Sequence, residues 1–123
     1  MNYRKKKCDD LAFQVILIRD NHRCLRCGER DVEVLVPSHC YGKKAYPNLR
    51  HELRNLLLLC DTCHKEWWHS RTVEAWAYFI DKYRERYDYI SVAKNRILKL
   101  NDIHYKDTEE ALKMVLNRLK EGE

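Results

Sequence analysis

Two short stretches, Cys24-Leu25-Arg26-Cys27 and Cys60-Asp61-Thr62-Cys63, are the strongest indication of how this chain folds. In each stretch two cysteines are separated by two residues, and thirty-two residues lie between the stretches. This spacing lets two backbone turns, called knuckles below, direct four thiolates at one tetrahedral Zn²⁺. The sequence therefore predicts a structural zinc site with all four cysteines as ligands.

Length and composition are those of a small folded protein. The chain has 123 residues, of which 45% are apolar and 35% charged, as in globular domains rather than disordered chains. No apolar run approaches the ~18 residues of a membrane span, so no membrane partner is expected. The basic opening, residues 1–7, is followed by Cys8-Asp9-Asp10 where a signal peptide needs apolar residues. We therefore expect an intracellular, cytoplasmic protein, in which thiols stay reduced and such cysteines bind metal.

The net charge of +5 is unevenly distributed. Residues 1–30 carry 8 Lys and Arg against 4 Asp and Glu, residues 39–71 carry 6 against 3, and residues 72–123 carry 10 against 10. The excess lies in the part that holds the cysteines, as in a surface that binds a polyanion. A solvated surface with a mild basic bias is the alternative interpretation.

Apolar periodicity predicts a mainly helical α+β protein, with residues 1–123 as a single domain. Leu11, Val15 and Ile18 recur at helical spacing and indicate a helix over about residues 8–20. The β-prone residues 33–36 end at Pro37 and suit a strand. The loop 41–53 follows, and the apolar run 56–59 favours a second strand.

Helices are predicted after the second knuckle, over residues 61–69, from Val73 to Tyr87, over 91–100, and from Asp107 onward. Asp107 and Glu110 have the spacing of an N-terminal capping box. The expected apolar faces are Val73, Trp76, Ala77, Ile80, Tyr83 and Tyr87 in one helix, and Ala111, Leu112, Val115, Leu116 and Leu119 in the last. The layout is thus a core of residues 22–70, a helix before it, and a helical extension over about 73–121.

Three further residues lie close to the knuckles in the sequence: His39 and Asn55 lie between the two knuckles, and His64 directly follows the second. The pattern consists of Ser38-His39 and, from Arg50 to His64, the run Arg-x-Glu-x-x-Asn-x₄-Cys-x-x-Cys-His. This pattern resembles the HNH (ββα-metal, treble-clef zinc) endonuclease family, most of all the small phage-type proteins related to the NinG recombination protein. The resemblance covers roughly residues 8–120 and is specific in its core. It implies a host-cytoplasmic location if the chain is phage-encoded.

The resemblance implies a metal-dependent endonuclease that hydrolyses DNA to a 5′-phosphate and a 3′-hydroxyl. His39 would be the general base, Asn55 would orient the His39 ring or pin its loop, and His64 would hold a catalytic Mg²⁺ or Mn²⁺. The alternatives are a surface histidine at 39, an ordinary turn asparagine at 55, and a Cys₃His zinc ligand at 64.

Four basic residues between His39 and the second knuckle are candidates for binding the scissile phosphate, or else solvated loop charges. They are Lys43, Lys44, Arg50 and Arg54.

Ser38 departs from the family pattern, since many members carry an Asp or His metal ligand there. A hydroxyl is a poor ligand, so the ion would depend on His64, helped by Asn55, Glu52 or His51.

The other histidines and the tryptophans are less informative. His69 follows His64 by five residues, which predicts a different helical face and a surface position. Trp67, Trp68 and Trp76 are expected in the core more than as platforms for base stacking.

Two other functions compete with the nuclease interpretation. A non-catalytic zinc module that binds nucleic acid or a protein would need the cysteines but not His39. A zinc-stabilised adaptor would need no nucleic acid at all. The coincidence of His39, Asn55 and His64 favours the enzyme.

Overall fold

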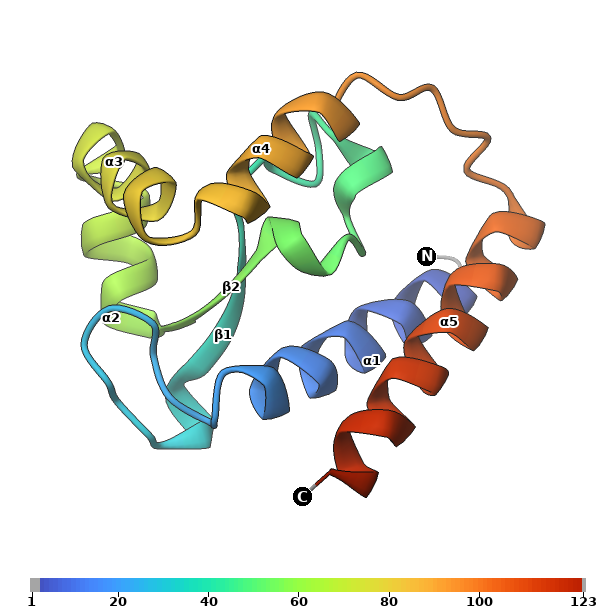
Figure 1. Ribbon diagram of the computed structural model, residues 1–123, viewed down its shortest axis with the longest axis horizontal. Coiled ribbons are helices and arrows are strands. Elements are labelled where there is room, and N and C mark those ends of the chain that lie inside the picture. Colours follow the sequence, from blue (N-terminus) through green and yellow to red (C-terminus); the bar gives the residue numbers. More distant parts are fainter. Residues whose placement is uncertain (1–2, 123) are drawn as a thin grey trace.

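The computed structural model describes residues 3–122 and is a mainly helical α+β fold (Figure 1). Its main elements are α1 (Tyr3–Arg19), β1 (Leu35–His39), β2 (Leu56–Cys60), α2 (Asp61–Cys63), α3 (Thr72–Lys82), α4 (Arg84–Ala93) and α5 (Asp102–Glu121). Short 3₁₀ turns cover Val32–Val34, Pro47–Leu49 and Leu53–Asn55, and a π-helical turn covers His64–Trp68. Within residues 3–122 no helix is both long and apolar enough to cross a membrane.

The two predicted strands form an antiparallel hairpin in which Leu35 lies opposite Cys60 and His39 opposite Leu56. Pro37 is tolerated because each strand of a two-stranded sheet has a free edge, where a missing N–H costs no ladder bond. All five residues of β2 are buried. The Leu25 N–H donates to the Leu58 carbonyl at 2.8 Å, so the first knuckle is attached directly to β2.

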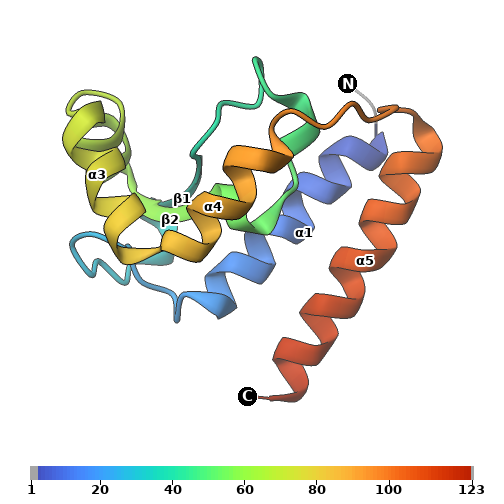
Figure 2. The same ribbon diagram turned by 45° about the horizontal axis from the view of Figure 1, so that its top comes forward.

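The predicted first helix is confirmed as α1, although it begins earlier, at Tyr3. Its apolar stripe is buried as the periodicity indicated, with Leu11, Ala12, Val15 and Ile16 no more than 5% exposed. Helix α5 lies beside α1, with the N-terminal ends of the two helices close together (Figures 1 and 2). The two helices thereby close one side of the core.

The predicted continuous helix from Val73 to Tyr87 is wrong, because the chain breaks at Tyr83 (φ −126°, ψ 50°) between α3 and α4. Helix α3 buries Ala75 and Phe79, whereas Val73 is 87% exposed. Aromatic packing selects this face: the Phe79 ring lies 6.3 Å from that of Trp68, edge to face.

The predicted helix over residues 91–100 is also wrong, since α4 ends at Ala93. The Asn48 side-chain amide donates to the carbonyls of Ala93, Lys94 and Arg96 at 3.0–3.2 Å and so ends the helix. Helix α5 begins at Asp102, because its cap is Asn101, six residues before the predicted cap at Asp107; the Asn101 side chain accepts from the His104 N–H at 3.0 Å. An asparagine is as good a cap as an aspartate.

Candidate functional site

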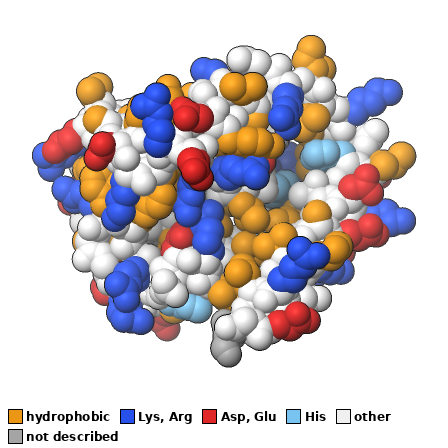
Figure 3. Space-filling model, in the orientation of Figure 1, with side chains coloured by type: hydrophobic (Ala, Val, Ile, Leu, Met, Phe, Trp, Pro, Cys, Tyr) orange, Lys and Arg blue, Asp and Glu red, His pale blue; other side chains and the backbone are white. Residues whose placement is uncertain are grey.

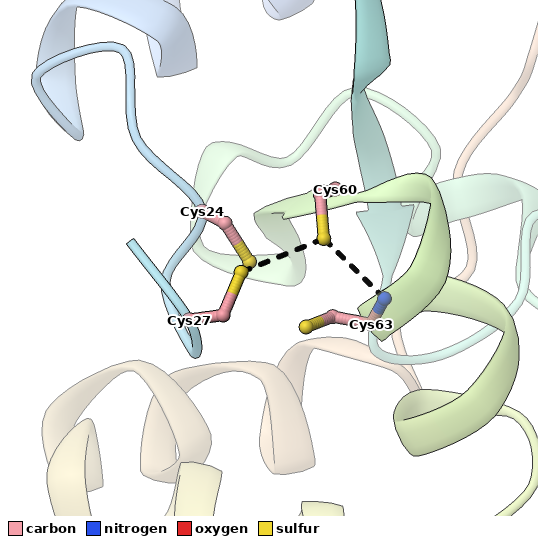
Figure 4. A group of neighbouring side chains, drawn as sticks. All are labelled: Cys24, Cys27, Cys60 and Cys63. Atoms are coloured by element: carbon pink, nitrogen blue, oxygen red, sulfur yellow. Dashed lines mark hydrogen bonds between the residues drawn. The ribbon is translucent and has the colours of Figure 1, made fainter. Parts of the chain in front are cut away.

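The four knuckle cysteines meet at one point, as the sequence predicts. Gly28 adopts φ +82° and so closes the first knuckle, where its N–H donates to the Cys24 carbonyl at 3.0 Å. In the second knuckle the Cys63 N–H donates to the Cys60 sulfur at 3.4 Å, which caps the first turn of α2. Figure 4 shows the sulfur atoms of the two knuckles side by side.

This cluster fits a structural metal such as zinc. All four sulfur atoms lie within 4.8 Å of one another, and Cys27 and Cys60 are 3.6 Å apart. Sulfurs at about 2.3 Å from a tetrahedral Zn²⁺ are separated by about 3.8 Å. Within residues 3–122 no other group of three or more His, Cys, Asp or Glu ligand atoms converges in this way.

A pocket of about 340 Å³ lies beside the hairpin, between β1, α1 and the loop after β1. It is lined by His39, Lys43, Arg50 and His64, four of the residues that the sequence singled out, and by His69 and Asp9. Lys43 and Arg50 come from the loop 40–55 that joins the strands, whereas His39 belongs to β1, Asp9 to α1, and His64 and His69 to the π-helical turn after α2 and its C-cap.

His39 occupies the last position of β1 and is held by its neighbours. Its Nε2 atom lies 3.0 Å from the Arg50 carbonyl oxygen. A carbonyl only accepts, so Nε2 carries the proton and Nδ1 keeps its lone pair. Burial lowers the pKa of His39, and the charges of Lys43 and Arg50 act in the same direction. The ring is therefore neutral at neutral pH and able to accept a proton at Nδ1.

Asn55 is fully buried, and its side chain hydrogen-bonds to the backbone of the loop rather than to His39. Its Oδ1 atom accepts from the Tyr41 N–H at 2.9 Å, and its Nδ2 atom donates to the carbonyls of Tyr41 and Leu49 at 3.0 and 3.2 Å. Of the two roles considered for Asn55, orienting the His39 ring or pinning its loop, these contacts favour the second. They fix the loop that also carries Arg50.

Ser38 is buried and orients His64. The Ser38 hydroxyl lies 2.9 Å from His64 Nδ1, so a proton at Nδ1 would leave the Nε2 lone pair of His64 available to a ligand. Burial and the neighbouring His69 lower the pKa of His64, which favours the neutral form. The serine that seemed a poor metal ligand thus sets the orientation of the imidazole.

His69 is exposed as expected, but its predicted separation from His64 is wrong. In an α-helix residues five apart point about 140° away from each other. Here the His69 N–H bonds to the His64 carbonyl at 3.2 Å, in a π-helical turn, and the two rings lie edge to face at 4.5 Å. Such turns are frequent at functional sites, and no sequence signal distinguishes this one from an α-helix.

Asp9 is a pocket residue that the sequence analysis missed. Its carboxylate accepts from Arg50 Nε and Nη2 at 2.8 and 2.6 Å, and lies 2.7 Å from His51 Nε2. Burial opposes ionisation of Asp9, but the hydrogen bonds from Arg50 and His51 outweigh it and hold its pKa well below the ordinary value. Asp9 lies in α1, 41 residues from Arg50, and only the tertiary fold joins them.

The remaining candidates do not line this pocket. Lys44 is exposed on the loop. The Arg54 guanidinium stacks on the Tyr89 ring at 3.8 Å and pairs with Glu52 at 3.4 Å. Trp67 and Trp68 are each 3% exposed, so both belong to the core.

No protein-family model, curated protein or solved structure matches this chain significantly.

Proposed function

We propose that this protein is a metal-dependent endonuclease of the HNH type, with a ββα-metal finger stabilised by zinc at the four cysteines. The observation that carries the proposal is the pocket lined by His39, His64 and Lys43, in which His64 directly follows Cys63 of the cysteine cluster in the chain. The proposed substrate is DNA, and the proposed reaction is hydrolysis of a phosphodiester bond.

His39 acts as the general base in this proposal. Its Nδ1 atom takes a proton from a water molecule while the water oxygen attacks phosphorus, the bond to the 3′-oxygen breaks, and that oxygen is protonated from solvent. The Arg50 carbonyl at 3.0 Å holds the His39 tautomer that this transfer requires. Lys43, which lines the same pocket, supplies positive charge to the phosphate.

A catalytic divalent ion would be held by His64, with His69 as the nearest second imidazole. When bound, it would stabilise the negative charge that develops on the phosphate and the leaving oxygen. Mg²⁺ demands near-ideal octahedral oxygen coordination and gives up its water reluctantly. Mn²⁺ also favours oxygen, but as a transition ion it accepts an imidazole ligand more readily than Mg²⁺ does. We therefore expect Mn²⁺ to support cleavage better than Mg²⁺.

A plasmid-cleavage assay with Mn²⁺, Mg²⁺ or EDTA tests the proposal. His39→Ala should lower the cleavage rate by about 10²–10⁴ with zinc content and DNA binding kept. His64→Ala should also lose cleavage, but excess Mn²⁺ should restore part of it. His22→Asn, which removes an exposed histidine at φ 52°, is the control and should cut normally. Wild-type cleavage by His39→Ala would exclude this mechanism.

A non-catalytic zinc module that binds nucleic acid or a protein is the second candidate. It is favoured by one observation: Arg50, a candidate phosphate ligand, has two of its guanidinium nitrogens bonded to Asp9. Metal-independent DNA binding without cleavage under any of these conditions would establish it instead.

A further inference from the structure

A second hollow, of about 330 Å³, lies between the C-terminal end of α1, the first knuckle and the junction of α3 with α4. Its charged lining consists of Arg19, Arg23, Lys82, Arg86 and Asp20. None of these residues lines the pocket around His39. Figure 3 shows Lys and Arg side chains gathered on the face that α4 occupies.

The only carboxylate of this hollow is already engaged by one arginine. Arg19 donates from Nε and Nη2 to the two oxygens of Asp20 at 2.9 and 2.7 Å. Its guanidinium also donates to the carbonyls of Leu53 and Leu56 at 2.7 and 2.8 Å. Asp20 therefore neutralises Arg19, whose donors are directed at these partners.

The charge of Arg86 is only partly compensated, by the Tyr83 ring, over which its guanidinium lies at 4.5 Å, and by Asp20. Its Nη2 atom is 3.9 Å from Asp20, beyond hydrogen-bond distance. Its Nη1 atom is the one buried side-chain nitrogen or oxygen in residues 3–122 that lacks a hydrogen-bond partner. Burial and the charge of Arg19 lower the pKa of Arg86. A buried donor without an acceptor is costly, and since Arg86 lines the hollow, an anion bound there would compensate its charge.

The two remaining cations add charge without a carboxylate to balance it. Arg23 is exposed at the rim. Lys82 donates to the Tyr78 hydroxyl at 3.1 Å, a neutral partner. The hollow thus combines three guanidinium groups and one ammonium group with a single carboxylate.

We propose that this hollow is a binding site for a phosphate group. Planar guanidinium groups bind tetrahedral oxyanions through paired N–H donors, and an ammonium group adds a point charge. The volume of about 330 Å³ accommodates one phosphate group with water. The phosphate belongs either to a nucleic-acid backbone or to a free ion. The site does not depend on cleavage at His39.

Inorganic phosphate tests the site directly, in the zinc-loaded full chain and with chloride at matched ionic strength. Phosphate should raise Tm in a saturable manner, and Arg86→Gln should weaken the apparent affinity by about 10–100-fold. Arg84→Gln is the matched control, since Arg84 is exposed, pairs with Asp88 at 3.1 Å and lies outside the hollow. If Arg86→Gln fails to fold, the double variant Arg23→Gln/Lys82→Gln replaces it. An equal response to phosphate and chloride, or in wild type and the hollow variants, would overturn the proposal.

A duplex oligonucleotide distinguishes the two sources of phosphate. If the site takes a backbone phosphate, Arg23→Gln/Lys82→Gln should make the plot of log DNA affinity against log salt concentration less steep. The decrease in slope should correspond to the loss of about one to two phosphate contacts. If it takes a free ion, DNA affinity should stay unchanged while the phosphate response is lost. Both readouts are independent of cleavage, so failure of the nuclease proposal would leave this test intact.

Discussion

Replacing Asp9 by asparagine is the sharpest test of how the pocket is held together. Asp9 fixes the Arg50 side chain through two hydrogen bonds, and the Arg50 carbonyl fixes the His39 ring. Asparagine keeps the shape but removes the charge and replaces one acceptor with an N–H₂ donor. That donor would face the guanidinium of Arg50 or the His51 ring, so the chain of contacts to His39 would loosen.

The size of the effect follows from burial. Removing one partner of a fully buried ion pair costs about 3–5 kcal/mol, but the Asp9 side chain is 30% exposed and water compensates part of the loss. We expect Asp9→Asn to lower the free energy of unfolding by about 1–3 kcal/mol, and Tm by roughly 3–15 °C. Because Asp9 acts through Arg50, the cleavage rate should fall about 10–100-fold with little change in DNA affinity.

The pH dependence has a definite sign. The pKa of Asp9 is lowered in the folded protein, so its ionised form stabilises the fold at neutral pH. That contribution is complete above the unfolded pKa of about 4 and is lost as the pH falls further. The difference in unfolding free energy between wild type and Asp9→Asn should therefore shrink below pH about 4.

Urea denaturation at pH 7 and pH 3, together with single-turnover cleavage, measures these effects. Asp10→Asn is the matched control, because Asp10 pairs with Lys6 in the open, at 56% and 64% side-chain exposure, where such pairs contribute about 0–1 kcal/mol. Equal stability of the two variants at pH 7, or a difference between wild type and Asp9→Asn that is as large at pH 3 as at pH 7, would refute the reasoning.

Three further predictions concern the base, the loop and the metal. Since burial lowers the pKa of His39, the acid limb of kcat/KM against pH should have its midpoint below about 6.5; a midpoint above 7 would contradict this. Asn55→Ala should cost about 2–4 kcal/mol in urea denaturation, because a buried side chain loses three hydrogen bonds. The exposed Asn117→Ala should change stability by less than about 0.5 kcal/mol. Native mass spectrometry should find about one zinc per chain; Cys63→Ala should lose it and unfold, while Cys8→Ala, outside the cluster, should keep it.

Local chemistry made part of the fold predictable. The Cys-x-x-Cys spacing predicted which sulfur atoms meet, because knuckle geometry depends on four successive residues. The periodicity of Leu11, Val15 and Ile18 predicted α1, and the apolar run 56–59 predicted β2, because both segments lie against the core. These signals need no knowledge of distant residues.

The helical extension was predicted less well, because its boundaries depend on distant partners. Periodicity alone joined Val73 to Tyr87, but packing of Phe79 against Trp68 determines which face of α3 is buried. The end of α4 is decided by Asn48, about forty-five residues away. Propensity is a weak guide where such tertiary hydrogen bonds compete with it.

The sequence by itself identified the four cysteines that could hold a metal and the candidates His39, Asn55 and His64, since motif spacing is a local property. Only the tertiary structure decided how these side chains are held. It brought Asp9 from α1 to Arg50, set Ser38 against His64, and turned His69 beside His64 through a π-helical turn. The hydrogen bond of Arg50 to Asp9, at 2.6 Å, joins residues that are 41 positions apart in the chain, and that of His64 with Ser38, at 2.9 Å, joins residues that are 26 positions apart. Both exist only after the hairpin and α1 have packed, so no local pattern encodes them.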